Sequence, residues 1–229
     1  MSTEIRRHAK VGAEASGSVL SVSELTYSYQ RGGDELYGGL SYSFPTGALS
    51  VVTGPSGRGK STLLYLLGLM VRPTSGAVVV DQRRVDNLRD GERSLLRASR
   101  FGFVFQDSVL DLTRPILDSV IEPALYAGSS RAEAEPRALA LLTLLGMEDR
   151  ATHRPGEISG GQGQRVAIAR ALMNQPDVIL ADEPTGNLDL ANTDVVLDTL
   201  RSAAGSGCTV VLATHDPAVV AQADYLLEL

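Results

Sequence analysis

Eight consecutive residues have the types and spacing of a phosphate-binding loop. The segment Gly54-Pro55-Ser56-Gly57-Arg58-Gly59-Lys60-Ser61 matches the pattern G-x-x-x-x-G-K-[S/T]. Its glycines let the backbone curl, so that successive N–H groups point at phosphate oxygens, and a helix that follows adds its positive N-terminal end. Lys60 is placed to reach β- and γ-phosphates, and the Ser61 hydroxyl to bind Mg²⁺. The pattern predicts a phosphate site with a magnesium ligand beside it.

The residue choice at position 60 supports this interpretation. Only Lys10 and Lys60 are lysines among the 21 basic residues, and the rest are arginines. A compact ammonium fits a phosphate cradle better than a planar guanidinium does. A chance glycine-rich turn would show the pattern in about one chain of this length in a hundred. Arg58 is less expected in such a loop; a solvated side chain is the simple interpretation, and a contact to nucleotide or partner is the alternative.

Two carboxylates follow an apolar run further along the chain. Residues 178–181 read as a buried strand, and Asp182 and Glu183 come directly after it. Because successive side chains of a strand point to opposite faces, the two acids are expected to have different roles. Asp182 suits Mg²⁺, often held through water, and Glu183 suits a general base that polarises the attacking water. Without the phosphate loop, solvated loop acids would be the better interpretation.

A histidine follows a second apolar run. Residues 209–214 read as the next strand, and His215 comes after it, near the same edge of the sheet. From there it could bond a γ-phosphate and help to position water; a purely structural imidazole is the alternative. His8 and His153 have no such context, and no role is expected for them.

A second anion-binding helix end is predicted at Ser159-Gly160-Gly161-Gln162. This segment opens a helix over residues 161–173, and a serine with two glycines at a helix N-terminus leaves backbone N–H groups open to an anion. One ATP does not need two such cradles from one chain. We therefore expect this helix end to serve the ATP held by another copy.

The elements that position these residues alternate between strands and helices. Strands are expected over 19–29, 36–44, 48–53, 77–80, 101–105, 178–181 and 209–214, and helices over 60–70, 88–98, 116–126, 131–145, 161–173 and 191–204. No convincing strand lies between 106 and 176. The pattern predicts an α/β core with a helical subdomain inserted at about 107–175. Ser130 and Glu133 have capping-box spacing, but Pro136 suggests that the helix starts later.

Composition limits the class of protein. The chain has 229 residues, 43% of them hydrophobic, and its longest apolar stretch, 63–71, is too short to cross a bilayer. Residues 1–17 lack the apolar core of a secretion signal and are expected to form a flexible tail before a domain over 18–229. The single cysteine, Cys208, allows no internal disulfide, which fits the cytoplasm. The net charge of −6 argues against broad nucleic-acid binding.

These motifs together resemble the ABC ATPase family, over nearly the whole chain from about residue 19. The segment Ser159 to Gln162 matches the family signature, with Ile158 where leucine is common and Gly163 where glutamine is common. The resemblance implies a P-loop NTPase core sheet with an N-terminal antiparallel β part and an inserted helical subdomain. It also implies ATP hydrolysis with ATP and Mg²⁺ as the bound groups.

The resemblance gives roles to further residues. Gln106 looks like the glutamine that contacts Mg²⁺ and senses the membrane partner, and Asn187-Leu188-Asp189 like the loop that crosses the dimer interface. His215 matches the switch histidine, and Thr62 belongs to the nucleotide-binding set. Tyr29 sits where the family stacks an aromatic ring on adenine, with Tyr27 as the alternative; either ring could simply pack in the strand.

The resemblance is strongest to an exporter subgroup with lipoprotein-releasing, macrolide-efflux and antimicrobial-peptide systems. It implies a second ABC ATPase subunit, with a homodimer expected, and a separate permease that holds the chain at the inner face of the membrane. Relatives with long coiled coils are excluded, because Gln106 and Ser159 lie only 53 positions apart, and two-cassette translation proteins because one set of motifs is present. Regulation of a membrane-coupled cell-wall hydrolase stays open as an alternative.

Overall fold

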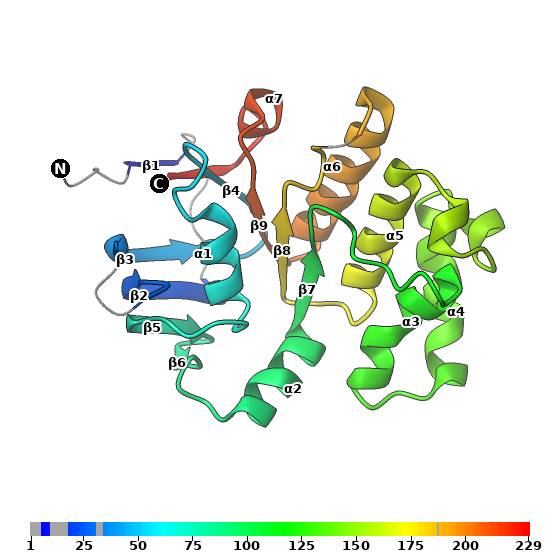
Figure 1. Ribbon diagram of the computed structural model, residues 1–229, viewed down its shortest axis with the longest axis horizontal. Helices are drawn as coiled ribbons and strands as arrows, with labels where there is room; N and C mark the ends of the chain where they lie inside the picture. The colour runs from blue at the N-terminus through cyan, green and yellow to red at the C-terminus, as the bar shows by residue number, and fades with distance from the viewer. Residues whose placement is uncertain (1–5, 10–17, 31–33, 187) are drawn as a thin grey trace.

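The computed structural model describes residues 6–9, 18–30, 34–186 and 188–229, and two β-sheets organise them (Figure 1). The first has six strands in the order β1-β10-β4-β9-β8-β7. These strands are β1 (Arg6–Ala9), β4 (Leu49–Thr53), β7 (Phe101–Val104), β8 (Val178–Asp182), β9 (Thr209–Ala213) and β10 (Tyr225–Glu228). All neighbours in it are parallel except β1, which pairs antiparallel with β10.

The parallel arrangement brings the functional segments to one edge. Every residue of β8 and β9 is buried, as expected for parallel strands covered on both faces. In the pairing register, Ala213 of β9 lies between Val52 of β4 and Asp182 of β8. The carboxyl ends of these three strands therefore meet, and we call this the carboxyl edge. The phosphate loop, Glu183 and His215 follow strands that end there, and Asp182 is the last residue of β8.

Alternate residues of the central strands face two different cores. Val51, Ile179 and Val210 belong to the core that contains the side chains of α3 to α6. Their neighbours Val52 and Leu180 belong to the core shared by α1 (Lys60–Leu67) and the second sheet. Figure 1 shows these two groups of elements on opposite sides of the central strands. The second sheet is antiparallel, in the order β3-β2-β5-β6, and consists of β2 (Leu20–Tyr27), β3 (Leu36–Phe44), β5 (Ser75–Val80) and β6 (Arg83–Arg84).

A helical region separates β7 from β8. Residues 106–176, all of them described, contain helices and turns and no strand. After α2 (Asp90–Arg100) and β7 come α3 (Ile116–Tyr126), α4 (Arg131–Leu144), two 3₁₀ turns (Glu148–Arg150 and Pro155–Glu157) and α5 (Gly160–Leu172). A Cβ added at Gly102 of β7 would lie 2.4 Å from the Ala171 carbonyl oxygen, so a glycine there is what lets α5 pack directly on the sheet. The remaining helices are α6 (Leu190–Gly205) and α7 (Pro217–Val220).

The predicted α/β class, with a helical insertion and an N-terminal antiparallel sheet, is confirmed, and two local expectations need correction. Helix α4 begins at Arg131, with Pro136 inside it. The Ser130–Glu133 capping box satisfies the first orphan N–H groups, which offsets the one bond that proline removes. Residues 6–9 of the expected flexible tail form β1, because β10 offers them unpaired backbone groups. The rest of the tail lies outside the described residues, and so do Gly32 and Gly33 of the segment Gly32-Gly33-Asp34, whose residue types predict a turn.

The helices are short. Among the residues described, none forms a helix that is long and apolar enough to span a membrane.

Candidate functional site

The phosphate loop connects β4 to α1 at the carboxyl edge. Its tip, Pro55 to Arg58, is exposed. The Lys60 ammonium bends back into the loop and donates to the carbonyl oxygens of Gly54 at 2.9 Å and Pro55 at 3.2 Å. Gly54 has φ +140°, and a Cβ there would lie 2.6 Å from the Leu229 carbonyl oxygen, so only glycine fits. The loop thus forms a compact ring of backbone with one ammonium at its centre.

The N-terminus of α1 is left open toward this ring. Gly59 is its N-cap residue and has no side chain to accept from the first N–H groups, and the first turn contains no acidic residue. Helix N-termini carry unpaired N–H groups and a partial positive charge. An anion in the loop would satisfy both, as the sequence predicts for a phosphate.

Ser61 and Asp182 meet beside the loop. The Ser61 hydroxyl donates a hydrogen bond to the Asp182 carboxylate, which is only 8% exposed. Burial raises the pKa of Asp182, while the bond from Ser61 opposes this; the Glu183 charge raises it further and Lys60 lowers it. Within the described part of the chain, no three His, Cys, Asp or Glu side chains gather as a metal site. One hydroxyl and one carboxylate fit Mg²⁺ that takes its other ligands from phosphates and water.

Glu183 is held by residues that follow β9. Thr214 donates its hydroxyl to Glu183 Oε2 at 2.8 Å, and the His215 backbone N–H donates to Oε1 at 3.2 Å. The His215 ring contacts the same Oε1 through Nδ1 at 2.7 Å. Since a carboxylate only accepts, Nδ1 carries the proton in this contact. The His215 side chain is 76% exposed and that of Glu183 is 14% exposed, so the imidazole covers the carboxylate from the solvent side.

Tyr29 and Tyr27 lie near the start of α1 but in different environments. Tyr29 is 71% exposed, and its hydroxyl bonds the hydroxyl of buried Thr62. Tyr27 is half-buried and packs on the core of the second sheet, with its ring edge-on to that of Tyr29 at 5.0 Å between centroids. Tyr29 is therefore better placed than Tyr27 for the predicted stacking on adenine, which stays a prediction.

Gln106 and Gly160 share a small pocket with Glu183. It has a volume of about 200 Å³ and is completed by Asp107, Ser108, Gln164, Pro184 and Leu188. The Gln164 amide donates to the Phe105 carbonyl at 3.3 Å, which ties the loop before Gln106 to α5. Gln106 and Gly160, which are far apart in the sequence, thus lie close together beside Glu183, the candidate general base.

The signature segment caps its own helix. Ser159 Oγ accepts from the Gln162 backbone N–H at 3.2 Å, and the Gln162 side chain accepts from the Ser159 N–H at 2.9 Å. A Cβ added at Gly160 would meet nothing within 4 Å. The sequence predicts an anion site here, and α5 belongs to the core on the face opposite α1. The chain's own packing gives no reason for glycine at position 160.

The loop expected at a dimer interface is described in part. Asn187 lies outside the described residues. Leu188 packs half-buried on the helical core, and Asp189 caps α6 by accepting from the Asn192 N–H at 2.8 Å. Gly161 lies beneath this segment, since a Cβ there would be 3.4 Å from Leu188.

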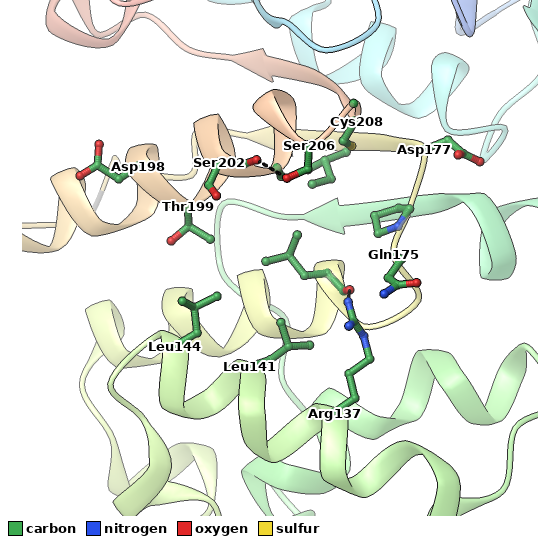
Figure 2. A pocket seen from close by; sticks show the side chains of 15 residues that line it. Arg137, Leu141, Leu144, Gln175, Asp177, Asp198, Thr199, Ser202, Ser206 and Cys208 are labelled. Carbon is green, nitrogen blue, oxygen red and sulfur yellow. Dashed lines mark hydrogen bonds between the residues drawn. The ribbon is translucent and has the colours of Figure 1, made fainter.

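A larger cavity lies away from this chemistry. It has a volume of about 740 Å³, and Figure 2 shows Asp198, Thr199 and Ser202 of α6 across from Leu141 and Leu144 of α4. None of its lining residues belongs to the phosphate loop, the acidic strand end or the signature segment. The volume of a cavity therefore does not locate the candidate site. The arrangement of charged and hydroxyl groups at the carboxyl edge locates it.

Two contacts at the site were missed by sequence reasoning. Thr214 holds Glu183, and its place directly before His215 at a strand end was the available signal. Tyr37 donates its hydroxyl to the Gly59 carbonyl at 2.7 Å, and the only signal was an aromatic residue before two glycines in a strand.

Comparisons with known proteins agree with this geometry. A family model described as "ABC transporter" matches residues 37–186. The macrolide export ATP-binding/permease protein MacB of Burkholderia pseudomallei is 43% identical over 215 residues, which cover 93% of this chain and 33% of that protein. The lipoprotein-releasing system ATP-binding protein LolD of Aquifex aeolicus is 46% identical over 184 residues, 80% of this chain and 82% of that protein. The chain spans about a third of the length of the macrolide export relatives.

A solved structure extends the agreement to the fold. The ATP-binding cassette MJ0796, in a dimeric post-hydrolysis state with ADP and Pi, superposes with a TM-score of 0.84 at 34% identity, covering 92% of this chain and 94% of that one. The expected exporter-type resemblance and ABC ATPase fold are confirmed. An open helix N-terminus behind a glycine-rich loop, an acid pair and His215 thus stand on a matching fold, and the chain belongs to the ABC transporter family, as one of its ATP-hydrolysing cassettes.

Proposed function

We propose that this cassette works as a head-to-tail pair and powers a membrane permease. ATP would lie between the phosphate loop of one copy and the Ser159–Gln162 segment of the other. Closure of the pair would complete the site, and hydrolysis with product release would reopen it. The permease would hold the pair at the cytoplasmic face of the membrane, where ATP is supplied.

Gly160 carries the case for a shared site. A glycine with empty space around its Cβ position is not required by this chain's own packing, and it exposes backbone N–H groups that a partner's nucleotide could approach closely. The helix end that directly follows the phosphate loop is that of α1. The cassette MJ0796, which this chain resembles, is a dimer in its post-hydrolysis state.

Each group at the carboxyl edge would have a distinct role in hydrolysis. Lys60 and the N-terminus of α1 would bind the β- and γ-phosphates, and Ser61, Asp182 and Gln106 would hold Mg²⁺. When bound, Mg²⁺ neutralises charge on the phosphate oxygens. Glu183 would accept a proton from the attacking water, since its carboxylate is ordered by Thr214 and His215.

Adenine binding and the γ-phosphate contact complete the assignment. Tyr29 would stack on the base, because its ring is exposed beside the first turn of α1. His215 would turn from the Glu183 carboxylate toward the γ-phosphate, because its side chain is mostly exposed and held by one ring contact. This rotation would break one ring contact, that of His215 Nδ1 with Glu183 Oε1.

The permease would dock in a groove between α2 and α3. The groove has a volume of about 590 Å³, and Leu95, Val109 and Tyr126 on its rim are each more than 60% exposed. Its floor contains Phe101, Phe103 and Phe105, whose rings stack at 6.0–6.1 Å. Exposed apolar side chains gathered around a groove mark an interaction site.

The groove is linked directly to the catalytic segments. Phe105 in its floor immediately precedes Gln106. Arg170 of α5 donates to the carbonyl oxygens of Ser108 at 2.7 Å and Val109 at 2.8 Å. A partner pressing on the groove would therefore move both the Gln106 loop and the helix that bears Ser159.

Mixing two inactive variants tests the shared site. Lys60→Ala removes the phosphate contact and Ser159→Arg blocks the signature end, so each homodimer should be inactive. A head-to-tail heterodimer gathers both lesions in one site and leaves the other intact, so the mixture should recover hydrolysis and ATP-dependent dimers. Full activity of Ser159→Arg alone would refute the proposal, as would a mixture that neither hydrolyses ATP nor dimerises with the permease supplied.

A second experiment tests the docking groove. Leu95→Glu places a charge on the groove rim and should abolish co-purification with the permease. Leu139→Glu is the matched control, because Leu139 is 39% exposed on α4 and does not line the groove. If Leu95→Glu still co-purifies as the control does, the permease binds elsewhere.

A further inference from the structure

Strand β3 contains a distortion that the sheet itself does not need. Tyr37, Gly38 and Gly39 all have positive φ, at +74°, +51° and +80°. In the pairing of β2 with β3, one residue lies between Leu25 and Tyr27, whereas three lie between Leu36 and Leu40 opposite them. Two extra residues thus bulge from β3. A bulky aromatic residue in the left-handed region is strained, and such strain clusters at functional sites.

The bulge turns Tyr37 onto the phosphate loop. Its side chain is buried, 8% exposed, and its hydroxyl donates to the Gly59 carbonyl at 2.7 Å. A Cβ at Gly59 would lie 2.9 Å from that hydroxyl and 3.3 Å from the ring, so the ring and the loop are in close contact. Burial, and then the neighbouring Tyr29, raise the pKa of Tyr37, which keeps its hydroxyl protonated as a donor.

The geometry points to Tyr37 as a positioning residue for the phosphate loop. The Gly59 carbonyl and the Lys60 N–H belong to one planar trans peptide, so they point in opposite directions. Leu63 N–H also donates to the Gly59 oxygen, at 2.7 Å, and the tyrosine uses its second lone pair. The two hydrogen bonds to this oxygen fix the orientation of the peptide. The Lys60 N–H then points toward the mouth of the loop, where a phosphate would bind.

The effect on binding follows from preorganisation. Gly59 has φ +90° and no side chain of its own, so its peptide depends on these two hydrogen bonds and on the contact with Tyr37 and Leu36. Without the tyrosine hydroxyl, the peptide samples orientations in which the Lys60 N–H does not face the phosphate. Ordering it again on binding reduces affinity. One neutral hydrogen bond corresponds to about a 3- to 10-fold change in the dissociation constant.

Tyr37→Phe is the direct test, because it keeps the ring and removes only the hydroxyl. ATP and ADP are titrated into the full chain with Mg²⁺, and KM and kcat are measured in parallel. We expect both nucleotides to bind about 3- to 10-fold more weakly, with KM rising by more than kcat falls. Tyr42→Phe is the matched control, since it also removes one hydroxyl, from a half-buried ring of the same strand that packs against Phe44.

A second measurement separates positioning from packing. In the nucleotide-free protein, amide hydrogen exchange in residues 54–62 should be faster in Tyr37→Phe than in the parent, while the melting temperature stays close to that of Tyr42→Phe. Parent-like affinity and exchange in Tyr37→Phe would overturn the inference, and so would a fall in kcat with KM unchanged.

The inference rests on the proposed role of the phosphate loop. A third variant, Lys60→Ala, distinguishes a failure of that role from a failure of the role of Tyr37. If Lys60→Ala binds ATP as the parent does, the proposed loop function fails. If Lys60→Ala loses binding while Tyr37→Phe binds like the parent, only the role of Tyr37 fails.

Discussion

Replacing Glu183 with Gln separates chemistry from folding at this site. The carboxylate has three contacts, two to His215 at Oε1 and one to the Thr214 hydroxyl at Oε2. A glutamine keeps one oxygen as an acceptor for the His215 contacts. Its new NH₂ group can donate to the Thr214 hydroxyl oxygen, which then reverses its role. All three contacts survive, and only the ability to accept a proton from water is lost.

The two expected magnitudes are therefore very different. Rearranging satisfied hydrogen bonds should change the free energy of unfolding by less than about 1 kcal/mol. Losing a general base should slow hydrolysis by about 10²- to 10⁴-fold, which corresponds to about 3–5 kcal/mol in the activation barrier. ATP affinity should be retained, so the variant should accumulate as an ATP-bound dimer.

Three measurements test the predicted effects of Glu183→Gln on hydrolysis, stability and dimer formation. They are steady-state ATPase rate, thermal melting, and size-exclusion chromatography with and without ATP. Glu133→Gln is the matched control, because it is also a carboxylate-to-amide change in a residue that keeps its capping contact, on α4. Hydrolysis by Glu183→Gln at the parent's rate would show that another group activates water. A rate loss matched by an equally large loss of stability would show that Glu183 is structural.

Three further outcomes are expected. Lys60→Ala should weaken ATP binding by about 10- to 150-fold while the circular dichroism spectrum stays unchanged, and unchanged affinity would contradict the assignment. Gly102→Ala should destabilise the fold by about 1–3 kcal/mol in melting experiments, because its Cβ would lie 2.4 Å from the Ala171 oxygen. Gly91→Ala is the control: Gly91 lies in helix α2, its added Cβ would meet nothing within 4 Å, and the change should stabilise the fold slightly. Burial raises the pKa of Cys208 to about 12, so iodoacetamide at pH 8 should label it slowly in the native chain and rapidly in urea. Fast native labelling would refute this.

The site was predictable where its chemistry follows directly after a buried strand. The phosphate loop, Asp182 and His215 each come after an apolar run, and parallel strands must end at the same edge. Local pattern therefore fixed both the residue types and their meeting place. The individual roles and the bounds of the helical subdomain stay predictions.

The other features of the fold and the site depend on contacts between distant segments, which no local sequence pattern indicates. Tyr37 reaches the loop only because β3 bulges against β2, and its left-handed backbone is unusual for a tyrosine. Strand β10 is four residues long and finds its place only when β4 and β1 lie on either side of it. The start of α4 at residue 131 agrees with the expected helix and its capping box, and only the later start that Pro136 suggested was wrong. The role proposed for Gly160 lies at a contact between two copies, which the sequence of one chain does not display.

The backbone at Glu183 also bears on how this position evolves. Its φ of +44° lies in the left-handed region, which glutamate adopts at a cost of about 1 kcal/mol or more and which glycine or asparagine tolerates better. Under the proposed role of Glu183, selection for turnover would favour a residue here that selection for backbone stability alone would not. In a descendant released from hydrolysing ATP, glycine or asparagine at position 183 would relieve this backbone strain while giving up the carboxylate contacts with Thr214 and His215.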